Sequence, residues 1–362
     1  MSLTGLSSGW SPGIQDQTIL FYVADNSRLR GFFNNYIFIC PYSRPGNSGV
    51  WQPIYPATNP SFWDAQGNSE VPRPSKVIGL TYGDQATQIW FISTVGELWM
   101  MFIAAGADPT NIGNWTKPQQ WTYKEDYRVL DAAVTMLTDG NLSLTARPQF
   151  FLSTADDRGL GMHTVWKMNG IESGGSWSPI YPYTPPSDQI STLCGTPPSA
   201  AAAHIFAIES KVGGRIFTSW KIDPANEDSA WTEWSIAPSP PFPVEQMMCV
   251  VLTDGRLQQI ANVKPFGGPV PDTNLYTRWK LTTEHGSNWS EWVPFQFLIG
   301  GAPVVLPFDN NRGLMTWTPW PSTTAFQSVG DDLENLVEWH KTNPVDSNAG
   351  WSQLDSDLDQ PF

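Results

Sequence analysis

The sequence predicts an all-β protein built from six similar antiparallel units. Six tryptophans recur at intervals of 54 to 64 residues, and each opens a short strand-like segment. These tryptophans are Trp51, Trp115, Trp177, Trp231, Trp289 and Trp351. No stretch has a sustained helical period, and 32 prolines with 30 glycines would interrupt helices often. A fixed period of this length is typical of arrays in which one structural unit is repeated.

The two clearest copies of the unit show which elements it contains. Residues 134–183 and 250–295 both read as a strand, an Asp-Gly turn, a second strand, a Gly/Pro loop, a third strand ending in Trp-Lys, and a last segment that begins with tryptophan. Runs of β-branched and aromatic residues parted by Gly, Asn, Asp and Pro are typical of strands and hairpins. The pairs Asp139-Gly140 and Asp254-Gly255 suit the positive φ of a type I′ turn, so we expect hairpins there.

Six such units are expected to close into a ring. The repeats extend roughly over residues 14–60, 74–125, 131–185, 190–240, 245–296 and 300–356. A six-bladed β-propeller is favoured because radial repetition protects the sheet edges. A linear solenoid is the alternative, but solenoid units are usually shorter and end in atypical polar caps. Pro-rich stretches recur once per repeat as loops, so residues 1–362 are expected to form a single domain.

The segment before the first repeat is a candidate for closing the ring. Residues 1–13 contain SGWSP, which is similar to GSWSP at the tryptophan of the third repeat. We therefore expect this segment to pair with the last blade.

Charge and cysteine content restrict the partners. A net charge of −14 and a pI near 4.6 argue against nucleic acid and anionic membranes, and no apolar stretch is long enough to cross a membrane. Only 15% of residues are charged, which suits uncharged, hydroxyl-rich partners. The N-terminus has no basic region followed by an apolar run, so a cytoplasmic location, with non-classical release as an option, is expected. Cys40, Cys194 and Cys249 are an odd set that is expected to be buried free thiols.

The repeated tryptophans have two interpretations. They either wedge between sheets as core residues, or they present a face on which a sugar ring stacks. The third position after them is apolar in most repeats and is expected in the core, whereas the second position, for example Glu233 and Glu291, is expected to face solvent. Simple strand alternation would place each tryptophan on the same wetter side as that second residue.

A second aromatic position precedes each tryptophan segment. We call this set the ladder, and its members are Phe33, Phe102, Trp166, Trp220, Trp279 and Trp339. Four are followed by Lys167, Lys221, Lys280 or His340, and Arg278 precedes Trp279. The ladder is either a blade core flanked by edge lysines or part of a pocket between blades. The candidate sugar-binding residues are Trp51, Trp115, Trp166, Trp177, Trp220, Trp231, Glu233, Arg278, Trp279, Trp289, Glu291, Trp339 and Trp351.

The unit also resembles a known family. A DGRL strand, an L-x-x-x-W strand and a G-x-W-x-x-W segment, repeated six times in an acidic, Trp-rich chain, resemble the β-propeller sugar-binding lectins of fungi and bacteria. The resemblance implies up to six sites between adjacent blades, each with an aromatic ring under the sugar. The fucose-binding branch has an Arg and a Glu in each blade, and this pair does not recur here. N-acetylglucosamine or another neutral sugar is therefore favoured over fucose.

Enzyme interpretations find little support in the motifs. The sialidase Asp-box S-x-D-x-G-x-x-W is missing, the four histidines lack metal-ligand spacing, and no nucleophile motif is found. Carboxylates from distant repeats could still assemble for glycoside hydrolysis. The acids Asp355, Asp357 and Asp359 lack the Gly and Glu of a calcium loop, so no metal or other cofactor is expected. The favoured function is a multivalent lectin that cross-links glycans or glycoproteins, with a protein-interaction scaffold as the alternative and an enzyme third.

Overall fold

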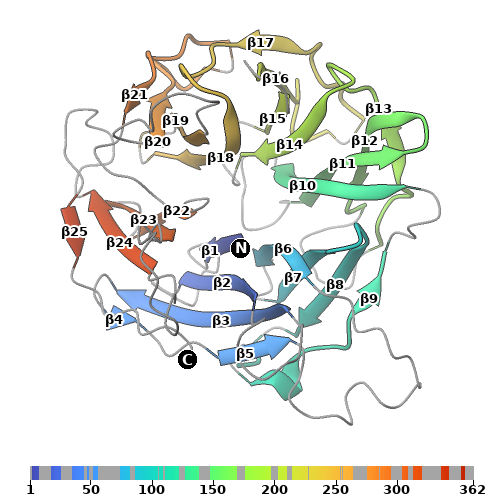
Figure 1. Ribbon diagram of the computed structural model, residues 1–362, viewed down its shortest axis with the longest axis vertical. Helices are drawn as coiled ribbons and strands as arrows, with labels where there is room; N and C mark the ends of the chain where they lie inside the picture. Colours follow the sequence, from blue (N-terminus) through green and yellow to red (C-terminus); the bar gives the residue numbers. More distant parts are fainter. Residues whose placement is uncertain are drawn as a thin grey trace, which may run out of the picture.

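The computed structural model consists of antiparallel sheets arranged around a central axis (Figure 1). It describes the backbone of residues 2–7, 18–25, 35–44, 47–48, 52–55, 74–81, 86–104, 106–108, 111–121, 127–137, 147–168, 176–196, 203–209, 214–226, 228–252, 254, 256–263, 275–284, 286–294, 304–308, 313–319, 336–341 and 352–354. Side chains are described only between residues 74 and 294.

Four consecutive four-stranded sheets are described with their side chains, and we call them blades. The first comprises β6 (Pro74–Thr81), β7 (Thr87–Ser93), β8 (Leu98–Ile103) and β9 (Gln119–Gln120). The second comprises β10 (Arg128–Leu137), β11 (Arg147–Asp156), β12 (Gly159–Trp166) and β13 (Tyr181–Tyr183). The third comprises β14 (Ile190–Gly195), β15 (His204–Glu209), β16 (Ile216–Trp220) and β17 (Ser235–Ala237). The fourth comprises β18 (Val244–Val251), β19 (Leu257–Val263), β20 (Leu275–Trp279) and β21 (Val293–Pro294).

Two further sheets are described by their backbone. One contains β1 (Ser2–Ser7), β2 (Thr18–Asp25), β3 (Asn35–Arg44), β4 (Asn47–Ser48) and β5 (Gln52–Tyr55). The other contains β22 (Val304–Phe308), β23 (Gly313–Pro319), β24 (Leu336–Lys341) and β25 (Ser352–Leu354). A single 3-10 turn, η3 (Ile112–Asn114), is the helical element among the described residues. The predicted all-β class is confirmed.

The first strands of the sheets surround the axis. Strands β1, β6, β10, β14, β18 and β22 contact one another in cyclic order, and β22 contacts β1. Figure 1 shows β1, β6, β10, β14 and β18 nearest the centre, while β9, β13, β17 and β21 lie on the rim. This radial arrangement of antiparallel sheets is that of a β-propeller.

Two local expectations differ from the structure. Strand β1 pairs with β2, within the first sheet, rather than with the last sheet as expected for residues 1–13. It contacts the last sheet by packing against β22. In the third repeat, the second strand was expected directly after Asp139-Gly140, but β11 begins at Arg147 because its apolar run is the one that pairs with β10. Residues 139 and 140 lie outside the described residues, and at the other expected turn Asp254 accepts a hydrogen bond from the Arg256 N–H at 3.0 Å.

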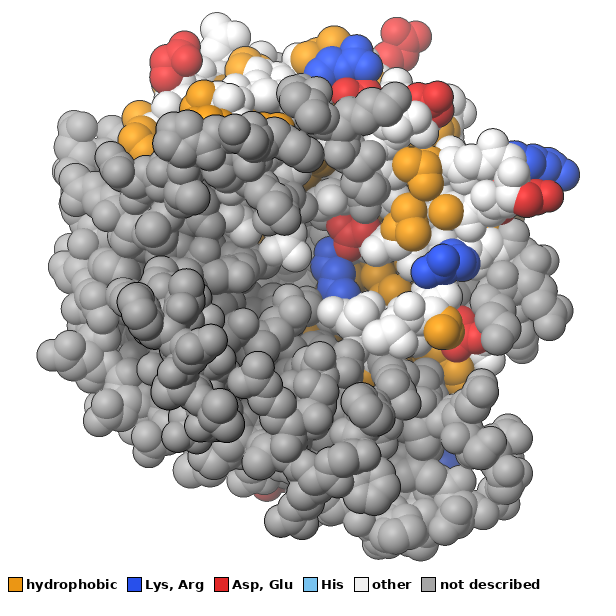
Figure 2. Space-filling view, viewed as in Figure 1, with side chains coloured by type: hydrophobic (Ala, Val, Ile, Leu, Met, Phe, Trp, Pro, Cys, Tyr) orange, Lys and Arg blue, Asp and Glu red, His pale blue; other side chains and the backbone are white. Residues whose placement is uncertain are grey.

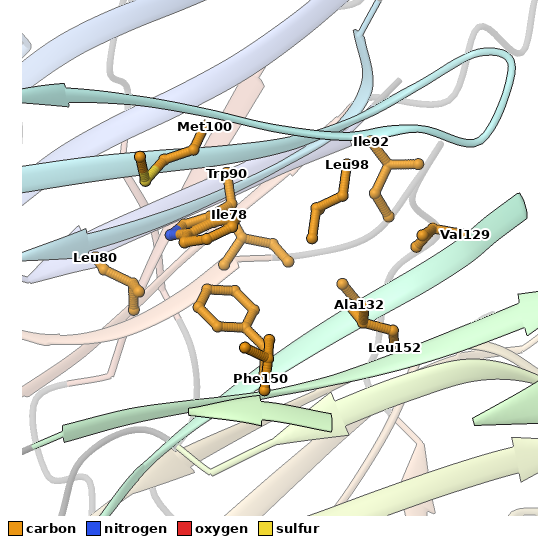
Figure 3. Close-up of a cluster of buried hydrophobic side chains, with 11 residues drawn as sticks. Ile78, Leu80, Trp90, Ile92, Leu98, Met100, Val129, Ala132, Phe150 and Leu152 are labelled. Atoms are coloured by element: carbon orange, nitrogen blue, oxygen red, sulfur yellow. The ribbon is translucent and has the colours of Figure 1, made fainter. Parts of the chain in front are cut away.

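The hydrophobic core lies between successive blades. One cluster joins the first and second blades, and Figure 3 shows Trp90 from β7 and Phe150 from β11 facing each other within it, with ring centroids 4.7 Å apart. A second cluster joins the second and third blades, and a third joins the third and fourth. The second and third blades therefore each have two apolar faces, one packed on the blade before and one on the blade after.

Near the axis, an ion pair joins two blades. The ammonium of Lys76 in β6 pairs with the Asp131 carboxylate in β10, and the Leu193 N–H in β14 donates to the other oxygen of that carboxylate at 2.8 Å. Lys76 and Asp131 each follow an irregularity in strand register, which recurs near the start of β14 and β18. One carboxylate thus links the first strands of three blades.

A hydrogen bond to a side-chain hydroxyl recurs in all four blades. The Ser or Thr that follows each repeated tryptophan accepts a hydrogen bond from the N–H of the ladder residue. The pairs are Thr116 with Phe102, Ser178 with Trp166, Thr232 with Trp220, and Ser290 with Trp279, at 3.0 to 3.1 Å. The N–H of the same Ser or Thr donates back to the ladder carbonyl at 2.8 to 2.9 Å. This pair of hydrogen bonds fixes the tryptophan segment on the third strand of its blade.

The lysines after the ladder are buried rather than lying at sheet edges. Lys167, Lys221 and Lys280 each form a bridge with the tryptophan that follows in their blade. The Lys221 ammonium donates to the Ser229 carbonyl at 2.7 Å, and that of Lys280 lies 5.7 Å from the Trp289 ring centroid. Burial lowers the pKa of Lys280 from 10.5 to about 8.

The hydrogen bond to the Thr232 hydroxyl predicts a loss of stability when that residue is replaced. Thr232→Val keeps the side-chain shape but leaves the Trp220 N–H without its acceptor, so we expect the free energy of unfolding to fall by about 1–2 kcal/mol. Urea unfolding measures the change. The exposed Thr282 is the matched control, and its replacement by Val is expected to change stability by less than about 0.5 kcal/mol. Equal effects of the two substitutions would contradict the structural role of the repeated bond.

The depressed pKa of Lys280 predicts a pH dependence. Between about pH 8 and pH 10.5 the unfolded chain holds a proton on Lys280 that the folded chain has released. The free energy of unfolding therefore increases as pH rises through this range. Lys280→Met removes that contribution. We expect the stability of the wild-type chain, relative to this variant, to increase from about pH 7.5 to about pH 10 in urea unfolding. A difference that does not change with pH would rule out the depressed pKa.

Candidate functional site

The ladder residues point toward the next blade. In the second blade, Trp166 is the cross-strand partner of Gln149, and Thr164 is that of Phe151. Directly opposed residues share a face of the sheet. Phe151 belongs to the core shared with the third blade, so Trp166 lies on that face too. Register places Phe102 and Trp220 in the same way, and all three rings are half-buried.

Trp279 has the same orientation in the fourth blade. Its strand neighbour Tyr276 and the cross-strand partner of that residue, Ala261, belong to the core shared with the third blade. Trp279 lies on the opposite face, which also carries Gln258, Ile260 and Thr277. It too is half-buried.

The repeated tryptophans point back toward the preceding blade. Trp177 lies 5.1 Å from Trp90 of the first blade, and Trp231 lies 5.0 Å from Phe151 of the second. Trp289 lies 6.0 Å from Phe206 of the third blade. Trp115 is buried outright. The three distances place Trp177, Trp231 and Trp289 in or against the interblade cores.

We expected each repeated tryptophan to lie on the same solvent-facing side as the second residue after it. The structure differs. Glu233 and Glu291 are exposed as predicted, but Trp231 packs in the same cluster as Trp234, three residues later. Trp289 and Trp292 share a cluster in the same way. Alternation fails because the segment contains one residue more than the third strand between two points of pairing: Trp231 bridges Lys221, whereas Ser235 pairs with Thr218.

Arg278 is part of the interface between the third and fourth blades. Its guanidinium is fully buried and lies 4.5 Å from the Trp289 centroid and 4.4 Å from that of Trp292. Nε donates to Gln259 Oε1 and Nη1 to the Pro238 carbonyl, both at 2.7 Å. Burial lowers the pKa of Arg278 from 12.5 to about 9. Two indoles and a carbonyl thus hold this cation between blades.

The interface between the second and third blades brings the two aromatic sets together. Trp166 enters it from the second blade and stacks on Tyr181, with centroids 5.3 Å apart and planes 22° apart. Tyr181 is 44% exposed, so the stacked pair is an aromatic surface that solvent reaches. Trp231 and Trp234 enter the same interface from the third blade. The ladder of one blade and the tryptophan segment of the next therefore face each other, as the interblade-pocket hypothesis requires.

Sequence reasoning missed the polar residues opposite the ladder. The cross-strand partner of each ladder residue in the four blades is buried and polar: Gln88, Gln149, His204 and Gln258. In three blades a buried threonine stands two residues before the ladder residue on the same face: Thr164, Thr218 and Thr277. The T-x-W spacing is visible in the sequence, but the glutamine requires knowledge of the strand register.

Three candidates cannot be placed by their side chains. Trp51 and Trp351 lie outside the described residues, and Trp339 belongs to β24, of which the backbone is described. Phe33, an additional member of the ladder, also lies outside them.

The described surface carries mixed charges. Figure 2 shows basic and acidic side chains scattered and close to one another over the coloured part of one face. The residues with described side chains include no cluster of three or more His, Cys, Asp or Glu that would hold a metal ion. Within the same residues, no helix has the length and apolar character that crossing a membrane requires.

No protein-family model and no curated protein matches the sequence of this chain. Its structure is similar to the BP39L lectin from Burkholderia pseudomallei, with 13% identity, a TM-score of 0.56 and 97% of each chain covered. It is also similar to a mutant of the Aleuria aurantia lectin in complex with alpha-methyl-L-fucoside, with 10% identity, a TM-score of 0.56, and 98% and 94% of the two chains covered.

Another structure of the Aleuria aurantia lectin, described as a six-bladed β-propeller with a novel fucose recognition mode, has 10% identity and a TM-score of 0.53 over 98% of this chain and 93% of that one. At identities this low, the likeness establishes the fold alone. The chain is a β-propeller whose architecture is shared with these lectins.

Proposed function

We propose that the protein is a lectin that binds terminal neutral sugars of glycans at several similar sites between blades. The observation that carries this proposal is the recurrence, blade after blade, of a half-buried ladder ring facing the next blade beside a buried polar partner. An aromatic face with polar groups at its edge suits a pyranose, which has both a C–H face and hydroxyls. The solvent-accessible stacked pair of Trp166 and Tyr181 is the best-described example.

The proposal includes a single six-bladed ring. The cyclic contacts among the first strands of six successive sheets support it, and each sheet falls within about one repeat of the sequence, apart from β1, which precedes the first repeat. Six weak sites on a rigid ring would bind glycans multivalently, with an avidity roughly 10²–10⁴ times the affinity of a single site, and would cross-link or agglutinate glycoconjugates. Fucose belongs in the sugar panel because the similar Aleuria aurantia lectin mutant was solved in complex with alpha-methyl-L-fucoside, while N-acetylglucosamine or another neutral sugar is our first choice.

A protein-interaction scaffold is the second candidate. Directly after each buried lysine stands an exposed aliphatic residue: Met168, Ile222 and Leu281, which are 44%, 62% and 54% exposed. They lie two residues beyond the end of the third strand in three blades, which places them toward one face of the propeller. A polypeptide partner could pack on such residues. An enzyme is our least favoured candidate.

A glycan array followed by isothermal titration tests the lectin proposal. We expect binding of a neutral monosaccharide with a stoichiometry of about three to six per chain and dissociation constants of roughly 0.1–1 mM, since each small polar ligand gains little net free energy. We expect no metal requirement, so adding a chelator should leave agglutination unchanged. A single tight site, or binding only to a polypeptide, would favour the other candidates.

Two substitutions within one interface separate a platform from a core residue. Trp166→Ala is expected to lower the stoichiometry by one site, because the sugar loses its stacking face. Trp231→Ala is expected to lower the free energy of unfolding by about 3–5 kcal/mol, because it empties an interblade cluster. Titration and thermal unfolding of both variants provide the measurement. If Trp166→Ala destabilises as much as Trp231→Ala and leaves the stoichiometry unchanged, the ladder is structural.

A further inference from the structure

The same short chain of hydrogen bonds occurs in the second and fourth blades. Gln149 Nε2 donates to Thr164 Oγ1 at 2.9 Å, and Thr164 Oγ1 donates to the Phe150 carbonyl at 2.9 Å. Gln258 Nε2 donates to Thr277 Oγ1 at 2.8 Å, and Thr277 Oγ1 donates to the Gln259 carbonyl at 2.8 Å. Two blades thus build one arrangement from equivalent residues.

This chain fixes the orientation of the glutamine amide. A threonine hydroxyl has one proton, and here that proton is used on a backbone carbonyl. The hydroxyl oxygen must therefore accept from the amide nitrogen, because a rotated amide would bring its oxygen against an oxygen that has no proton to offer. The carbonyl oxygen Oε1 of each glutamine is the atom left for another partner.

That oxygen is buried and has no hydrogen-bond partner in either blade. Gln149 Oε1 and Gln258 Oε1 are both unpaired, although the residues are only 4% and 2% exposed. A buried acceptor without a donor is unfavourable, and such groups are few in native proteins. Its recurrence at the same place in two blades indicates a common purpose rather than a local defect.

The unpaired acceptors lie next to the ladder. Gln149 is the direct cross-strand partner of Trp166, and Gln258 is that of Trp279, so glutamine and indole share a face of the sheet. A ring stacked on the indole would bring the substituents at its edge toward the amide oxygen. The threonine, already bonded twice, holds the amide in place and has no role as donor to a ligand.

We propose that Gln149 and Gln258 form two equivalent acceptor sites that each take one O–H or N–H donor of a neutral sugar stacked on Trp166 or Trp279. The inference rests on the lectin function proposed above and names its specificity-determining residues. A sugar carboxylate is not accommodated, because it would place a second acceptor against Oε1. The buried cation of the fourth blade, Arg278, pairs with Gln259 on the other face and does not compensate such a charge.

The other described blades lack the full arrangement. In the first blade, Met100 replaces the threonine, and in the third, His204 replaces the glutamine. The glutamine sites are therefore expected in the second and fourth blades among those with described side chains.

Titration of glutamine variants tests the proposal. The probes are the methyl glycosides of N-acetylglucosamine, fucose and glucose, titrated into the full-length chain. Gln149→Met and Gln258→Met preserve side-chain volume but remove the acceptor, so each is expected to lower the stoichiometry by one and the double variant by two. Gln246→Met is the matched control, because Gln246 is a half-buried glutamine in β18 away from the ladder, and its stoichiometry should equal that of the wild-type chain.

The outcomes separate this inference from the lectin proposal. If the wild-type chain binds a probe and the double variant binds it with the same stoichiometry and affinity, the acceptor role is wrong while the lectin function stands. If the wild-type chain binds none of the probes, both fail.

A crystal of the wild-type chain soaked with the bound probe gives a second test that does not depend on variant folding. A sugar hydroxyl or amide nitrogen within about 3 Å of Gln149 Oε1 or Gln258 Oε1 supports the proposal. A sugar bound elsewhere, with water at these oxygens, overturns it.

Discussion

The packing of one blade on the next is the constraint on which the rest of the structure depends. A sheet in a radial array must cover both of its faces, and in this chain the cover comes from large rings inserted between blades. Trp177, Trp231 and Trp289 each reach back to an aromatic ring of the preceding blade. The hydroxyl of the following Ser or Thr ties each segment to the ladder N–H, so the tryptophan is held facing backward while the ladder ring faces forward. The two aromatic sets thereby acquire different environments.

The same packing explains why cations are buried in an acidic protein. Arg278 lies between two indoles, and Lys221 and Lys280 lie near the rings of Trp231 and Trp289 while donating to loop carbonyls. Aromatic faces attract cations more strongly when water is removed, which offsets part of the desolvation cost. The lowered pKa values of Arg278 and Lys280 indicate that the offset is incomplete. These cations therefore belong to the packing between blades, and the polar groups available to a ligand lie elsewhere.

The sequence predicted what depends on period and missed what depends on register. The tryptophan spacing and the strand composition predicted all-β repeats, and the exposure of Glu233 and Glu291 was predicted from residue type. The side on which the tryptophans lie was not predicted, because alternation holds for a strand in continuous register. This segment has one residue more than the third strand between the Trp231–Lys221 bridge and the Ser235–Thr218 pair. The Ser or Thr after the tryptophan in five of the six repeats was a visible signal for the hydrogen bond to the ladder N–H. The glutamines opposite the ladder could not be found, since pairing Gln258 with Trp279 requires the register of β19 and β20.

Because the repeated tryptophans and the ladder residues face different blades, the blades can differ in binding chemistry without losing their packing. The residue opposite the ladder is Gln88, Gln149, His204 or Gln258 in the four described blades, while a tryptophan followed by Ser or Thr is present in all of them. Substitution opposite the ladder changes the hydrogen bonds offered at one interface and leaves the backward-facing tryptophan in place. Sites on one ring can then be unequal in affinity or sugar preference although the scaffold repeats. A lectin of this kind would recognise a glycan surface through the sum of related but non-identical contacts, with the avidity set by how many of its interfaces retain a usable donor or acceptor.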